Sequence, residues 1–139
     1  MALKRHQKFW LQAEKKWTEK WFKFITSQDY CNWFYISYNP NVTIEFIEAH
    51  PEYDWNWSNV SRNPNITMEI IEAHPEYNWD WYWLSQNPNL TIEFIEAHSK
   101  YNWDWDIISL KKFSKNKETF MIEEAKKYMA VYKIKKWWG

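Results

Sequence analysis

The chain has 139 residues, enough for one domain, and 22% of them are aromatic, including 13 Trp. Gly139 is the only glycine and Cys31 the only cysteine, which excludes glycine-rich phosphate loops, intramolecular disulfides and cysteine-based metal clusters. The net charge is zero, but residues 1–26 carry seven basic and two acidic side chains, residues 27–110 two and thirteen, and residues 111–139 nine and three. Basic ends therefore flank an acidic middle.

The chain lacks the patterns that direct a protein into or across a membrane. No apolar run approaches the roughly 18 residues of a membrane-spanning helix, so no transmembrane segment is expected. The chain does not open on a signal-peptide pattern. We therefore expect a soluble, intracellular protein that is not secreted.

Residues 1–26 form a basic region with helical periodicity. Aromatic and apolar side chains recur there at spacings of three and four, at Leu3, His6, Trp10, Ala13, Trp17, Trp21 and Phe24. Neither Pro nor Gly interrupts residues 2–25, so the pattern allows one long helix or two helices with a kink near Thr18. This region is expected to cover the N-terminal end of the fold.

Residues 39–110 are three copies of one 24-residue unit, without insertion or deletion. Residues 39–62 are NPNVTIEFIEAHPEYDWNWSNVSR, residues 63–86 are NPNITMEIIEAHPEYNWDWYWLSQ, and residues 87–110 are NPNLTIEFIEAHSKYNWDWDIISL. A degenerate copy without the Asn-Pro-Asn opening covers residues 15–38. A fixed period of this length is typical of solenoids, in which each unit buries its apolar face only by stacking on its neighbours.

Each full unit predicts two short helices. Asn-Pro cannot continue a helix, and the Thr that follows it (Thr43, Thr67 or Thr91) suits a helix N-cap. The second helix is predicted over residues 55–61, 79–85 and 103–109, where a Trp, an aliphatic residue and a Ser share one face. Together the units predict an all-α fold, a short α-solenoid or superhelix of two-helix repeats with capping helices at both ends, forming a single domain of residues 1–139.

Residues 111–139 predict a polar connector up to residue 117 and a basic helix over residues 118–138. Its apolar side chains form two stripes, one of Met121, Ala125, Tyr128 and Tyr132 and one of Val131, Ile134 and Trp138. Two stripes make a wide apolar face, so we expect this helix to lie across the last repeat as a C-terminal cap.

The repeat resembles two groups of proteins. Its layout, Asn-Pro, a Thr cap, a short helix, His-Pro and a second short helix, is similar to the bacterial leucine-rich repeat variant, which stacks paired short helices into a superhelix. Its amino-acid sequence more closely resembles the tandem NPNIT…WDWYWLS repeat proteins encoded by giant DNA viruses of amoebae. This second resemblance implies a viral protein of the virion or the host cytoplasm, and it implies no particular activity.

Most side chains that recur in every unit have structural explanations. His50, His74 and His98 are expected to close the first helices, because zinc needs ligands about 2.0–2.1 Å from one ion and neighbouring helices lie roughly 8–10 Å apart. The repeated Asn residues (Asn39, Asn41, Asn63, Asn65, Asn87 and Asn89) are expected to hold turns. Trp55, Trp79 and Trp103, with Tyr53, Tyr77 and Tyr101, are expected to form a packing ladder in preference to an aromatic platform for sugars or bases. No metal or cofactor is expected.

Two features remain as candidate protein-binding surfaces. The first is an acidic stripe on the first helices, formed by Glu45, Glu48, Glu69, Glu72, Glu93 and Glu96, which is either a solvated face or a docking surface for a basic partner. The second is Trp83, whose counterparts in the other repeats are Asn59 and Ile107. A Trp used once suits an exposed contact or packing against a cap.

The basic ends leave several partners open. They carry Lys4, Arg5, Lys8, Lys126, Lys127, Lys133, Lys135 and Lys136. These side chains suit nucleic acid, an anionic membrane surface or a protein partner, and they also allow self-association of basic ends with the acidic middle of another copy. The sequence predicts a non-catalytic interaction or scaffold module with a protein partner, and the alternative is a nucleic-acid-binding protein that uses the basic terminal helices.

Overall fold

The computed structural model describes the backbone of residues 4–138 and the side chains of residues 4–133. Residues 4–138 contain helices and no strand. The helices are α1 (Arg5–Thr26), α2 (Trp33–Tyr38), α3 (Ile44–Ala49), α4 (Trp57–Ser61), α5 (Met68–Ala73), α6 (Trp81–Leu84), α7 (Ile92–Ala97), α8 (Trp105–Leu110) and α9 (Ser114–Trp138). The predicted all-α class is confirmed.

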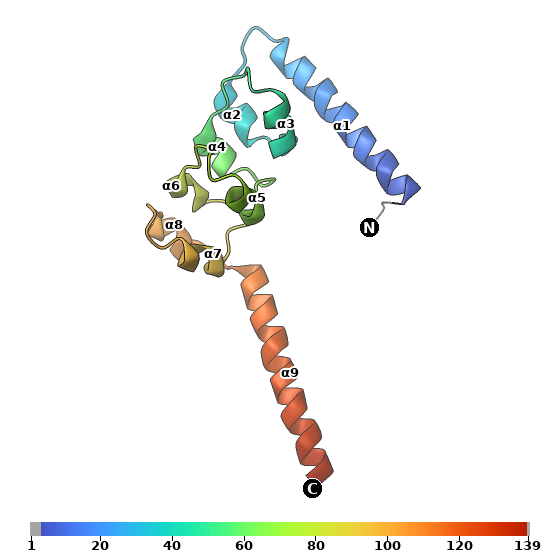
Figure 1. The fold of residues 1–139 in the computed structure, drawn as a ribbon, viewed down its shortest axis with the longest axis vertical. Helices are drawn as coiled ribbons and strands as arrows, with labels where there is room; N and C mark the ends of the chain where they lie inside the picture. Colours follow the sequence, from blue (N-terminus) through green and yellow to red (C-terminus); the bar gives the residue numbers. More distant parts are fainter. Residues whose placement is uncertain (1–3, 139) are drawn as a thin grey trace.

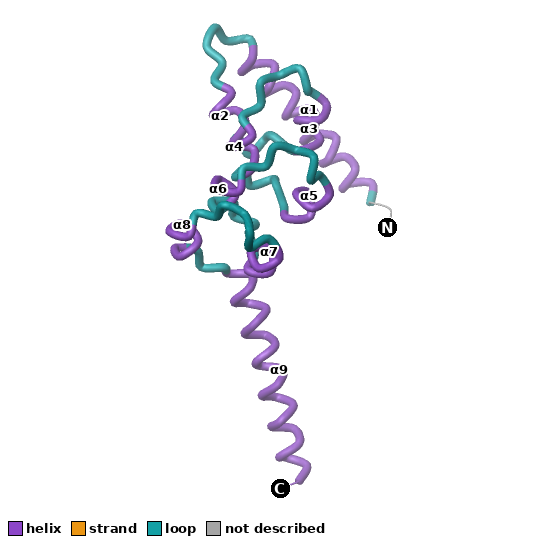
Figure 2. Tube along the Cα trace, turned by 60° about the vertical axis from the view of Figure 1, so that its left-hand side comes forward, coloured by secondary structure: helices purple, strands orange, loops and turns teal. Residues whose placement is uncertain are grey.

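The short helices form two columns joined by loops (Figures 1 and 2). One column, which we call the second-helix column, consists of α2, α4, α6 and α8, and α4 packs against both α2 and α6. The other, the first-helix column, consists of α3, α5 and α7, with the C-terminal end of α1 next to α3. The chain is therefore a short α-solenoid whose unit is one helix from each column, and two long helices flank it.

Each unit is set by local hydrogen bonds that its sequence dictates. The first Asn of each unit accepts a bond from the backbone N–H of the second Asn, at 2.8 Å in all three units. The following Thr then caps the first helix, as predicted, by accepting from the backbone N–H three residues on. The His residues at positions 50, 74 and 98 are the C-caps of these helices, which confirms their predicted place.

The second helices begin two residues later than predicted. They start at Trp57, Trp81 and Trp105, because the preceding Asn56, Asp80 and Asp104 act as N-caps through their side-chain oxygens. The Trp before each cap is therefore not helical. It lies in an extended segment and is buried, as Trp55, Trp79 and Trp103 show.

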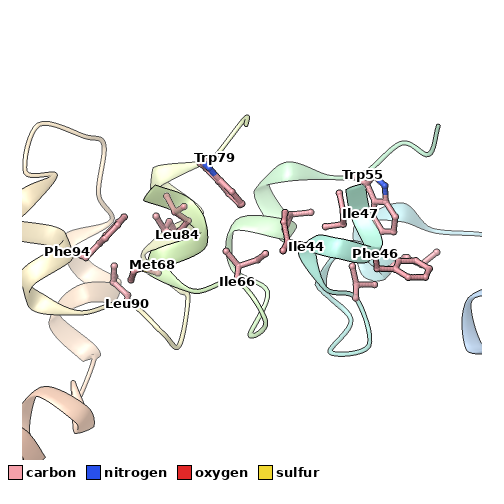
Figure 3. Close-up of a cluster of buried hydrophobic side chains, with 14 of the residues drawn as sticks. Ile44, Phe46, Ile47, Trp55, Ile66, Met68, Trp79, Leu84, Leu90 and Phe94 are labelled. Atoms are coloured by element: carbon pink, nitrogen blue, oxygen red, sulfur yellow. The ribbon is translucent and has the colours of Figure 1, made fainter. Parts of the chain in front are cut away.

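One continuous apolar core runs along the solenoid (Figure 3). Its most buried members recur once per unit: an aliphatic residue of the opening turn, such as Ile66, and one of the second helix, such as Leu84. The degenerate first unit supplies its own equivalents. Phe22 of α1 lies 4.8 Å from Phe46, ring centroid to ring centroid, and Ile36 of α2 is buried. The alignment of residues 15–38 with the repeat therefore corresponds to a structural unit.

The long helix α1 is a single helix, which settles the alternative of one helix or two in favour of one. Only its C-terminal end packs, and among the aromatic rings of the predicted stripe Trp21 alone packs against the core. Phe22 is buried and Trp21 and Ile25 are half-buried, whereas Trp10, Trp17 and Phe24 of the predicted stripe are exposed. Leu3 lies outside the described residues.

The expected packing of the C-terminal helix across the last repeat is wrong. In Figure 1, α9 projects away from α7, and every side chain from residue 117 to residue 133 is exposed. The stripe residues Met121, Tyr128 and Tyr132 are among them. Ile134 and Trp138 lie outside the residues whose side chains are described. The helix also begins at Ser114, four residues before its predicted start.

A short segment before α9 makes the cap instead. Lys111 stands where a fourth unit would have its first Asn, and its ammonium donates to the backbone carbonyl of Asn87 at 2.7 Å. Phe113 packs against the core with a left-handed backbone (φ 46°), a conformation that non-glycine residues rarely adopt. Asn116 accepts a bond from the backbone N–H of Ile92 at the start of α7. Residues 111–116 therefore close the first-helix column.

Candidate functional site

Buried polar side chains join consecutive units, so they are not free to bind a ligand. Ser61 donates to the Trp57 carbonyl in its own helix and accepts the backbone N–H of Asp80 in the next unit, both at 2.8 Å. Ser37 and Ser85 make the same pair of bonds. The amide of Asn63 reaches back one unit to the carbonyls of Ser37 and Asn39, at 3.0 and 3.1 Å. The repeated Asn and Ser residues thus form the junctions of the solenoid.

The repeated Trp and Tyr residues form a ladder inside the solenoid. The indole N–H of Trp79 donates to the carbonyl of His74 at 2.7 Å, and Trp55 and Trp103 do the same with His50 and His98. The Trp that opens a second helix packs on the Tyr of the next unit at Trp33, Trp57 and Trp81, most closely for Trp81 and Tyr101, whose stacked rings have centroids 3.7 Å apart. These contacts agree with the predicted packing ladder.

His50 and His74 lie beside carboxylates, whereas Nδ1 of His98 lies 2.8 Å from the backbone carbonyl of Phe94. The imidazole of His50 is 3.5 Å from Glu19 and from Glu52, and that of His74 is 3.1 Å from Glu76. Within the described part of the chain, no three His, Cys, Asp or Glu side chains are grouped closely enough to hold a metal ion.

The six carboxylates of the acidic stripe are all exposed on α3, α5 and α7, but the fold uses half of them. Glu48 accepts a 2.7 Å bond from the Tyr77 hydroxyl, which raises the pKa of Tyr77 from its usual 10.0 to about 12, because ionised Tyr77 would face a carboxylate. Glu93 accepts two bonds from the Asn116 amide, and these bonds lower its pKa. A bond from its own backbone N–H lowers the pKa of Glu69, with a further contribution from Thr67.

The remaining acidic residues, Glu45, Glu72 and Glu96, project from the same column of helices. The side-chain bonds found in the described residues do not engage them. They are therefore the part of the acidic stripe that is most available to a partner.

Trp83 is explained by a residue that the sequence analysis missed. The guanidinium of Arg62 lies 4.6 Å from the centroid of the Trp83 ring and 4.7 Å from that of Tyr38. Arg62 also donates to Asn59 at 2.7 Å and to Gln86, one unit further, at 3.0 Å. The signal was present in the sequence: Arg62 is the only Arg of residues 27–110, and it lies one period from both Tyr38 and Gln86. Trp83 is half-buried in this contact and is not a free exposed ring.

The basic ends lie on exposed parts of the two long helices. Lys4, Arg5 and Lys8 are exposed at the N-terminal end of α1, and Lys126, Lys127 and Lys133 are exposed on α9. Lys127 pairs with Glu124 of its own helix at 2.7 Å. Lys135 and Lys136 lie outside the residues whose side chains are described.

The second-helix column ends without a cap in the described structure. Trp105 has no ring stacked on it and is 58% exposed, and Leu110 beside it is also exposed. At the other end of this column, residues 30–34 and 54–57 line an open hollow of about 530 Å³. The sequence analysis foresaw neither feature, because it expected a cap to cover both columns.

Among the described residues, no helix combines the length and apolar character needed to cross a bilayer. Comparison of the chain with models of protein families, with curated proteins and with solved structures gave no match.

Proposed function

We propose that the protein is a non-catalytic interaction or scaffold module that binds a basic protein partner through Glu45, Glu72 and Glu96. The observation that carries this proposal is the internal use of the repeated polar side chains. The repeated Asn, Ser and buried Trp side chains bond to the backbone, whereas these three carboxylates project unengaged from one column of helices.

The resemblance of residues 39–110 to the tandem repeat proteins of giant DNA viruses supports a viral origin, with the partner in the virion or in the host cell. An extended surface of repeated elements is how solenoids bind other proteins. Negative charges on three consecutive units of such a surface fit a partner that carries several Lys or Arg side chains.

The test is capture of partners from infected-cell lysate by the full-length protein and by the triple variant Glu45→Gln, Glu72→Gln, Glu96→Gln. We expect a specific partner that the wild type retains and the variant loses. The matched control is Glu118→Gln, Glu123→Gln, Glu124→Gln on α9, which removes the same charge elsewhere and should keep the partner. Equal capture by all three proteins would refute binding of the partner through Glu45, Glu72 and Glu96.

A second candidate function is nucleic-acid binding by α9. It is favoured by the exposure of Lys126, Lys127 and Lys133 together with the aromatic rings of Tyr128 and Tyr132 on one helix. Such binding should weaken steeply with salt and disappear when the three Lys residues become Gln. A salt-independent signal would exclude it.

A further inference from the structure

The helix α1 exposes a row of aromatic rings that the solenoid leaves uncovered. Trp10, Trp17 and Phe24 follow one another at intervals of seven residues, about two helical turns, so they share one side of the helix. Their exposed fractions are 64%, 56% and 63%. We call these three side chains the aromatic row.

The solenoid holds α1 from another side. Phe22, the one buried residue of α1, points away from the aromatic row by more than a third of a turn, since each residue advances about 100°. In Figure 1 the N-terminal end of α1 diverges from the short helices. A flat surface can therefore reach the aromatic row without displacing the core contact of Phe22 with Phe46.

Positive charge lies beside the aromatic row. α1 carries six basic side chains and only two acidic ones, Glu14 and Glu19. Lys16, Lys20 and Lys23 are all exposed and lie on one flank, about 60–120° around the helix from the row, and Glu14 lies about 60° from the row on the opposite flank. Lysine stems can lie along apolar surface while their ammonium groups reach outward to negative charge.

This combination of charge and rings fits a lipid surface better than the other anionic partners. Trp rings favour the boundary between headgroups and acyl chains, and basic flanks attract anionic lipids. A nucleic-acid duplex would contact the Lys side chains through its phosphates but would leave the three rings without a role, because its bases are already stacked on one another. The helix α9 also exposes a stripe on one side, but its described members Met121, Tyr128 and Tyr132 include no Trp.

We propose that α1 docks the protein on anionic membrane surfaces, with the aromatic row in the headgroup region and Lys16, Lys20 and Lys23 against the lipid charges. This inference goes beyond the proposed binding of a protein partner and uses a different surface. The three carboxylates of α3, α5 and α7 remain available on the solenoid.

The test is co-sedimentation of the full-length protein with vesicles of phosphatidylcholine, with or without phosphatidylserine. We expect binding only to the phosphatidylserine vesicles and a decrease as salt is raised. The variant Trp10→Ala, Trp17→Ala, Phe24→Ala should lose on the order of tenfold or more in apparent affinity. All three residues are exposed, so its circular dichroism spectrum should match that of the wild type.

The matched control is Phe120→Ala, Tyr128→Ala, Tyr132→Ala, which removes three exposed rings from α9 and should bind vesicles like the wild type. Absence of wild-type binding, or equal losses in the two variants, would overturn the proposal. Binding of duplex DNA that depends on the aromatic row, without vesicle binding, would also overturn it and assign α1 to nucleic acid. The Glu45, Glu72, Glu96 variant should bind vesicles normally, so a failure of either proposal is seen separately.

Discussion

Asn63 and Asn87 each combine two roles that the sequence presents as one. Their side-chain carbonyl oxygens accept the backbone N–H of the second Asn in the local turn, which the Asn-Pro-Asn pattern predicts. Their amide groups bond to carbonyls of the preceding unit, which no local pattern predicts, because the acceptors lie 24 and 26 residues away. Both side chains are buried, so losing these bonds leaves polar groups without partners.

Asn39 and Asn63 allow the second role to be measured alone. Asn39 holds the same turn, but no Asn-Pro-Asn turn precedes it. We expect Asn63→Ala to lower the free energy of unfolding by about 1–3 kcal/mol more than Asn39→Ala, because only Asn63→Ala removes the bonds to the carbonyls of Ser37 and Asn39. Urea denaturation of both variants measures this difference, and equal losses would contradict the bridging role.

The pair of Arg62 and Trp83 shows where reasoning from one residue at a time fails. Trp83 was recognised as a departure from the repeat, but its explanation is a second departure in the preceding unit. The two side chains meet because Arg62 is the C-cap of α4 and Trp83 lies in the neighbouring α6, and predicting this contact requires the stacking geometry as well as the sequence.

At the scale of elements, local sequence signals were sufficient to predict the turns and the ends of the first helices. They were not sufficient to predict how elements far apart in the sequence pack together. The Thr caps, the Asn-Pro turns and the His ends of the first helices follow from backbone chemistry and were predicted correctly. The starts of the second helices were misplaced because the apolar pattern includes the buried Trp before the cap. Asn56, Asp80 and Asp104 were the available signal, since all three are residue types that favour N-caps.

The direction of α9 could not be predicted from its own sequence. A wide apolar face was interpreted as a packing face, but apolar side chains spread around a helix select no single neighbour. The contacts that close the array come from Lys111, Phe113 and Asn116, two of which are polar.

Removal of residues 123–139 should therefore leave the solenoid intact. Every described side chain of this segment, residues 123–133, is exposed, and we expect the free energy of unfolding to change by less than about 0.5 kcal/mol. In the full chain, Lys111→Ala should cost about 1–2 kcal/mol, because it removes a charged bond to the Asn87 carbonyl. Its exposed neighbour gives the control Lys112→Ala, which should be neutral. A truncation that destabilises more than Lys111→Ala would mean that α9 packs on the array.

At the scale of the whole molecule, the 24-residue period determined the architecture. The junctions between units repeat the same Ser and Asn bonds. The contact between two units therefore depends on residues that the units share and not on residues that differ between them. The period did not reveal what lies beyond the repeats, because the long helices α1 and α9 are mostly outside the lattice of contacts.

Deletion of residues 63–86 should consequently yield a shorter folded solenoid. The Asn87 amide would then meet the carbonyls of Ser37 and Asn39 in place of those of Ser61 and Asn63. We expect a cooperative thermal transition at a lower temperature, because one interface is lost. Deletion of residues 63–74 removes half a period and should abolish the transition. Calorimetry distinguishes these results, and similar behaviour of both deletions would contradict the modular junctions.

The open end of the second-helix column also sets a direction for unfolding. α8 is supported by a neighbouring second helix on one side only, whereas α4 and α6 are held on both sides. In a linear array with nearest-neighbour coupling, the unit with one missing interface has the lowest local stability. At the opposite end, α2 also has one second-helix neighbour, but its Trp33 is half-buried beside Phe22 of α1, whereas Trp105 of α8 is exposed. Unfolding should therefore begin at α8 and proceed unit by unit toward α2.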